Sequence, residues 1–149
     1  MFILKPIYKG RFDSLTLKRG KNLLQSSVLD DWQEQLTKSM LLKKIDILIN
    51  NAGVLISGLG STKTCLETGE EEIIKTFNTN TLGVLRVIKN TFPLMSNGAR
   101  IINISSGMGQ LDDMQSGHIA YRLSKVSLNA LSVILAKEFL SKNIKVNTI

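Results

Sequence analysis

A short β-branched run, Ile45-Asp46-Ile47-Leu48-Ile49, constrains the fold of this chain more than any other feature. It has the length and composition of a strand in a buried parallel sheet. A second run of this kind covers residues 100–104, and a third covers residues 144–149. Because parallel strands need long crossover connections, which are usually helical, the intervening segments are expected to contain helices.

Helical patterns alternate with these strands. Apolar residues recur every three to four positions over residues 30–42, 70–92 and 120–141, and the capping-box spacing Thr68-Gly69-Glu70-Glu71 opens the second of these segments. From residue 24 on, the order is therefore helix, strand, helix, strand, helix, strand. This order predicts an α/β fold, one right-handed half of a doubly wound parallel sheet.

Polar residues follow two of the predicted strands. Asn50-Asn51-Ala52-Gly53 come directly after the first run, and Ser105-Ser106 come after the second. Open α/β sheets bind their ligands at the carboxyl ends of their strands. Asparagine side chains there can brace neighbouring strands, while Ala52 and Gly53 let a ligand approach the backbone closely. An ordinary strand-ending turn is the alternative.

The last helical pattern begins with Tyr121-Arg122-Leu123-Ser124-Lys125. Residues four apart on a helix share a face, with about 5–6 Å between Cβ atoms. An ammonium about 4 Å from a phenolate is worth about 4 kcal/mol at an effective dielectric near 20, which brings a phenol towards useful proton transfer at neutral pH. Taken alone, this spacing also fits an ordinary exposed helix face.

Taken together and in this order, Asn-Asn-Ala-Gly at 50–53, Asn80, Ser106, Tyr121 and Lys125 resemble the short-chain dehydrogenase/reductase family, and its carbonyl reductases in particular. The resemblance covers residues 24–149. It implies a partial NAD(P)-binding domain, the second half of a Rossmann-type doubly wound parallel sheet. Residues 1–23 are basic, show no sustained periodicity and are predicted to form an irregular segment; a targeting peptide is the alternative.

The resemblance implies an oxidoreductase that transfers hydride between NAD(P)H and a carbonyl or alcohol substrate. Tyr121 would donate the proton, Lys125 would assist it and contact the nicotinamide ribose, and Ser106 would hydrogen-bond the carbonyl oxygen. Asn80 would sit at a helix kink and hold a water in the proton relay; a tolerated surface asparagine is the alternative. The residues implied to bind the cofactor are Asn50, Asn51, Ala52, Gly53, Tyr121 and Lys125.

The cofactor is expected to be NADP or NAD, with NADPH favoured by the resemblance alone. The glycine-rich turn that holds the pyrophosphate in this family does not occur in the sequence, nor does the Pro-Gly segment after the last strand. We therefore expect a family member truncated at both ends. The alternative is a catalytically silent module that depends on a partner or forms homo-oligomers through its two long helices.

Charge and cysteine content bear on other classes of function. The net charge of +7 comes mostly from residues 1–44, with nine Lys/Arg against four Asp/Glu, and no nucleic-acid-binding motif accompanies it, so no nucleic-acid partner is expected. The single Cys65 gives neither a disulfide framework nor a metal-site spacing, so we expect no metal and a cytoplasmic location. No apolar run approaches 18 residues, so no membrane span is expected. His118, the sole histidine, is expected to be a loop residue without a catalytic role.

Overall fold

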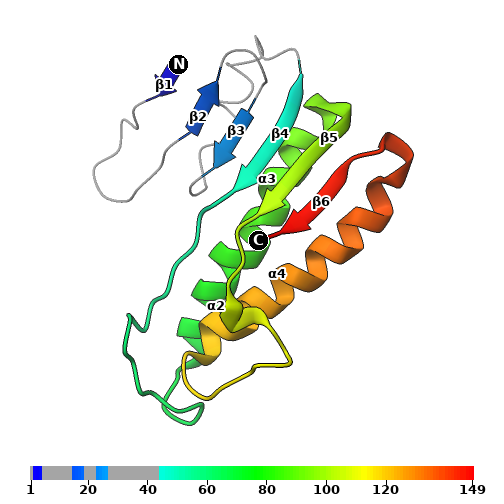
Figure 1. The fold of residues 1–149 in the computed structure, drawn as a ribbon. Coiled ribbons are helices and arrows are strands. Elements are labelled where there is room, and N and C mark those ends of the chain that lie inside the picture. Colours follow the sequence, from blue (N-terminus) through cyan, green and yellow to red (C-terminus); the bar gives the residue numbers. More distant parts are fainter. Residues whose placement is uncertain (1, 5–14, 19–22, 27–43) are drawn as a thin grey trace.

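A parallel sheet forms the frame of the protein. The computed structural model describes residues 2–4, 15–18, 23–26 and 44–149. Within these residues, one sheet has the strand order β1-β2-β3-β4-β5-β6 (Figure 1). Strands β3 to β6 are parallel, whereas β1 and β2 pair antiparallel at one edge. The strands are β1 (Phe2–Leu4), β2 (Leu15–Lys18), β3 (Leu23–Ser26), β4 (Ile45–Asn50), β5 (Met95–Asn103) and β6 (Lys145–Thr148).

The described helices lie on one side of this sheet (Figure 1). They are α2 (Glu70–Phe77), α3 (Val84–Thr91) and α4 (Ile119–Glu138), with a π-helical segment η1 (Asn78–Gly83) between the first two. Short 3₁₀ turns complete the set: η2 (Phe92–Leu94), η3 (Gly107–Gly109) and η4 (Phe139–Lys142). The predicted α/β fold with a parallel sheet is confirmed, while the helix predicted over residues 30–42 lies outside the described residues.

The core lies between the sheet and the helices. Leu48 and Ile101, opposite each other on β4 and β5, are fully buried, and so is Leu128 of α4. Burying one such side chain contributes about 1.5–3 kcal/mol. By length and composition alone, residues 119–142 would suffice to cross a membrane. Because Leu128 and Leu135 pack in the core, we interpret this segment as a core helix.

Three local expectations from the sequence are corrected. Strands β1 and β2 lie in the segment predicted to be irregular, because runs this short show no period and are formed by pairing with the sheet. The strand expected over residues 100–104 begins earlier, at Met95, so Asn97 and Gly98 lie inside β5, where the pairing shifts between Ile45 and Ile47 and Gly98 adopts φ 77°. Finally, the capping box expected at Thr68 does not form. The Thr68 hydroxyl donates to the Thr64 carbonyl, and the N-cap residue of α2 is Gly69, without a side-chain hydrogen bond.

Candidate active site

The ends of β4 and β5 are joined by a buried pair of amides. Asn50 lies opposite Asn103, and its Nδ2 donates to Asn103 Oδ1 at 2.8 Å. Asn103 in turn donates to the hydroxyl of Ser132 on α4 at 2.8 Å. All three side chains are buried. Asn50 therefore braces the strands and α4 through its side chain, which is the structural role considered for these asparagines, and Asn103 is a site-supporting residue that the sequence did not reveal.

The backbone after β4 forms an open edge of the site. Asn51 and Gly53 are exposed, in contrast to Asn50. A Cβ atom on Gly53 would lie 3.6 Å from Asn80 Oδ1 and 3.7 Å from Lys125 Nζ. A Cβ there would make ordinary contact with both polar groups, so the Asn80 amide and the Lys125 ammonium converge beside the Gly53 backbone. The fold brings together residues from β4, η1 and α4 that are distant in the sequence.

Asn80 is held by the π-helical segment that interrupts the α2–α3 pattern. Its side chain is 0% exposed, which rules out the surface-asparagine alternative. Its Oδ1 accepts the Val54 N–H at 2.8 Å, and its Nδ2 donates to the Val54 carbonyl at 3.0 Å and to the Ser124 hydroxyl at 2.9 Å. The kink expected at Asn80 is therefore a π-helical segment, a feature that often occurs at functional sites.

Tyr121 and Lys125 lie one turn apart on α4, where Tyr121 is half-buried and Lys125 is buried. Lys125 is only 3% exposed, and its Nζ lies 5.5 Å from the centroid of the Tyr121 ring. The ammonium donates to the Ile104 carbonyl at the end of β5, at 2.7 Å. Burial lowers the pKa of Lys125 from its usual value. The alternative of an ordinary exposed helix face is therefore wrong for Lys125.

Ser106 begins the turn that follows β5. Its hydroxyl accepts the N–H of Met108 at 3.2 Å and so caps η3. The neighbouring Ser105 donates to Asn129 Oδ1 at 2.6 Å, and Asn129 donates to the Gly109 carbonyl at 3.1 Å, which fastens the turn to α4. A Cβ on Gly109 would lie 2.9 Å from the backbone carbon of Lys125. Ser105 thus helps to hold the turn against α4, and the turn bearing Ser106 packs directly on α4 at Lys125.

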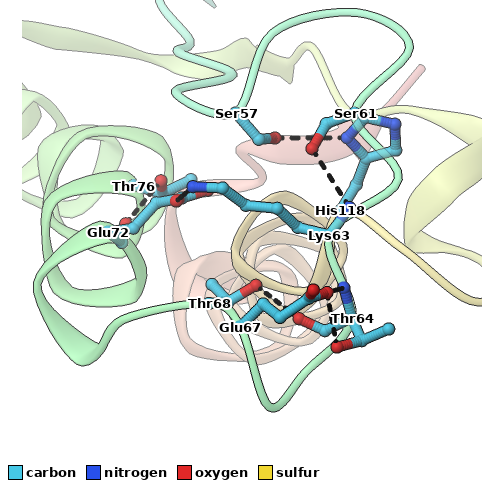
Figure 2. A network of polar contacts seen from close by, with 9 residues as sticks. All are labelled: Ser57, Ser61, Lys63, Thr64, Glu67, Thr68, Glu72, Thr76 and His118. Carbon is cyan, nitrogen blue, oxygen red and sulfur yellow. Dashed lines mark hydrogen bonds and ion pairs between the residues drawn. The ribbon is translucent and has the colours of Figure 1, made fainter.

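The long loop over residues 54–69 is fixed by polar contacts (Figure 2). The hydroxyl of Ser57 lies 3.2 Å from His118 Nδ1, which connects the loop to the N-cap residue of α4. Glu67 accepts the N–H and the hydroxyl of Thr64, both at 2.7 Å, and these bonds lower the pKa of its carboxyl group. His118, which adopts a left-handed backbone with φ 49°, therefore serves as a link between loops.

Comparisons with known proteins identify the family to which the chain is similar. Residues 22–149 match the family described as short chain dehydrogenase. The rhamnolipids biosynthesis 3-oxoacyl-(acyl-carrier-protein) reductase of Pseudomonas aeruginosa is 35% identical over 115 residues, which are 73% of this chain and 43% of that reductase. The chain spans about half the length of the curated relatives that it matches.

Solved structures of similar proteins share the fold. A short-chain dehydrogenase/reductase of unknown function from Caenorhabditis elegans, solved with cofactor, gives a TM-score of 0.70 at 27% identity, over 81% of this chain and 45% of that one. The angucycline C-6 ketoreductase LanV, solved with bound NADP, gives a TM-score of 0.64 at 25% identity, over 78% of this chain and 44% of that one.

Proposed function

The chain belongs to the short-chain dehydrogenase/reductase family, and from this premise we propose that it carries the proton-transfer site of an oxidoreductase acting on a carbonyl or alcohol with NAD(P)H. The observation that carries the proposal is the meeting of the Asn80 amide and the Lys125 ammonium beside Gly53. Relatives named as reductases support this function over the silent module.

Tyr121 would act as the general acid in carbonyl reduction. Its phenol would donate a proton to the carbonyl oxygen, and the resulting phenolate would be stabilised by the Lys125 ammonium. With the 5.5 Å separation between Nζ and the ring centroid taken as the charge separation, the attraction is about 3 kcal/mol at an effective dielectric near 20. That is roughly a hundredfold in equilibrium. The bond from Nζ to the Ile104 carbonyl keeps the ammonium in place.

Ser106 would orient the substrate. Because its oxygen accepts the N–H of Met108, its own hydroxyl proton remains available to donate to a carbonyl oxygen. Donors that are already fixed in position before the reaction stabilise developing negative charge most effectively. Asn80 would keep the segment around Lys125 in place and maintain the proton relay.

The end of β4 fits a nicotinamide cofactor. Asn51 and Gly53 are exposed, Ala52 is small, and the Lys125 ammonium lies close to Gly53, so a ribose could approach the backbone. We infer that residues 51–53, Tyr121 and Lys125 hold the nicotinamide ribose, and that Asn50 supports them from the core. The cofactor, when bound, would supply or accept the hydride. NADPH is our proposed choice, supported by the resemblance and by the NADP bound in LanV.

We propose that copies of the chain associate through the two long helices, and the outward face of α4 supports this. Val133 and Ile134 are 62% and 54% exposed although both are apolar. A contact through the long helices would remove this surface from water. A cytoplasmic location, without nucleic-acid or membrane partners, is part of the same proposal.

A thermal melt of the purified protein with NADPH and with NADH tests the proposed function. A ligand at 100 times its dissociation constant stabilises the folded state by about 2.7 kcal/mol, so we expect a higher melting temperature with at least one cofactor. Tyr121→Phe should abolish carbonyl reduction and retain most of the cofactor-induced shift, because it removes the proton donor but leaves Lys125 and residues 51–53 to hold the ribose. Melting that is indifferent to both cofactors would refute the proposal.

A further inference from the structure

Ser124 lies between Tyr121 and Lys125 in the sequence and has no role in the proposed reaction itself. We propose that Ser124 is a positioning residue, whose hydroxyl fixes the Asn80 amide to the helical turn that bears Tyr121 and Lys125. The inference rests on the proposed function and concerns how the same site is held together.

The Ser124 hydroxyl both accepts and donates a buried hydrogen bond. The side chain is 0% exposed, its hydroxyl accepts from Asn80 Nδ2 at 2.9 Å, and it donates to the Tyr121 carbonyl at 2.7 Å. A serine hydroxyl has one proton. Since that proton goes to the Tyr121 carbonyl, the oxygen can only accept from Asn80. The hydroxyl of Thr81, next to Asn80, also donates to the Ser124 carbonyl at 2.9 Å. Two adjacent residues of η1 therefore hydrogen-bond to one residue of α4.

These bonds define the orientation of the Asn80 amide. Its Oδ1 and one N–H of Nδ2 bind the peptide groups of Val54, and the second N–H of Nδ2 binds the Ser124 hydroxyl. The amide thus connects the loop after Gly53 to α4. Its Oδ1 and the Lys125 Nζ lie at 3.6 and 3.7 Å from the same point beside Gly53. Loss of the Ser124 hydroxyl would leave a buried N–H without its acceptor and loosen this arrangement.

The same helix offers a matched control. Ser132 is 4% exposed, accepts from the buried amide of Asn103 at 2.8 Å, and donates to the Leu128 carbonyl at 2.8 Å. Its surroundings thus resemble those of Ser124, but its bonds reach the strand brace rather than Asn80. Substitution of either serine by alanine should lower the melting temperature to a similar extent.

Kinetics separate positioning from stability. We expect Ser124→Ala to lower kcat for carbonyl reduction about tenfold, measured well below the melting transition, with the cofactor KM changed by less than about twofold. Ser132→Ala loosens the Asn50–Asn103 brace beneath the cofactor-holding residues, so its effect should fall on the cofactor KM and not on kcat. Ser124→Thr, which keeps the hydroxyl, should recover most of the wild-type kcat. Equal kcat losses in the two alanine variants, or no loss in either, would overturn the proposal.

A second measurement does not depend on turnover. Hydrogen exchange of the Asn80 side-chain amide, followed by NMR, should accelerate in Ser124→Ala and remain at the wild-type rate in Ser132→Ala. If the wild type reduces no carbonyl, the proposed function fails and the exchange rates alone decide the link: faster exchange in Ser124→Ala supports it, and unchanged exchange overturns it.

Discussion

Substitution of Gly109 by alanine should destabilise the protein by steric conflict with the backbone of α4. The new Cβ would lie 2.9 Å from both the backbone carbon and the Cβ of Lys125, and 3.1 Å from its carbonyl oxygen. Real Cβ atoms essentially never approach another atom so closely. The opposing atoms belong to a long helix that is also bonded to the sheet and to η1, so they cannot rotate away as the end of a side chain would.

The magnitude follows from the nature of the contact. Overpacking a well-packed site typically costs about 1–3 kcal/mol. Because Gly109 meets backbone atoms rather than a flexible side chain, we expect about 2–3 kcal/mol. For a chain of this size, each kcal/mol shifts the melting temperature by about 2–4 °C, so the expected decrease is about 4–12 °C.

Gly107 provides the matched control, because it lies in the same 3₁₀ turn and has no heavy atom within 4 Å of its added Cβ. Gly107→Ala should change the free energy of unfolding by less than about 1 kcal/mol. The added methyl group meets no clash, and alanine stabilises the folded state slightly because it lowers the conformational entropy of the unfolded chain. Urea denaturation of both variants measures the difference. A Gly109→Ala variant within about 0.5 kcal/mol of the wild type, or as unstable as Gly107→Ala, would refute the steric argument.

Two further predictions concern buried polar groups. Burial lowers the pKa of Lys125 from its usual 10.5, so folding penalises the ammonium at pH values below the lowered pKa, and the penalty fades as the pH rises to 10.5. The stability of the wild type relative to Lys125→Met should therefore increase over this window in denaturant titrations, and a constant difference would contradict the assignment. Asn103→Ala removes two buried hydrogen bonds and should cost about 2–4 kcal/mol. Asn97→Ala, at an exposed position of β5, should stay within about 0.5 kcal/mol of the wild type; equal denaturation midpoints for these two asparagine variants would show that the amide pair contributes nothing.

The sequence by itself determined the layers of the fold and where the residues of the candidate site occur along the chain. The run at residues 45–49 is short, β-branched and followed by Asn50-Asn51-Ala52-Gly53, and both properties are local. The same holds for the spacing of Tyr121 and Lys125, because a helix places residues four apart on one face. Asn78, Asn80 and Gly83 disfavour a regular helix, and the structure forms a π-helical segment where they occur.

Only the tertiary structure decided which side chains brace the site and which remain open. Asn50 and Asn51 are the same residue type, yet Asn50, the last residue of β4, is buried and reaches Asn103, whereas Asn51 follows the strand and is exposed. The hydrogen bonds Val54–Asn80, Asn80–Ser124 and Asn50–Asn103 join residues that are 26, 44 and 53 positions apart in the chain. Local periodicity carries no information about such pairs. The role of Ser124 and the close approach of Gly109 to α4 arise from packing between elements, and therefore became visible only in the folded chain.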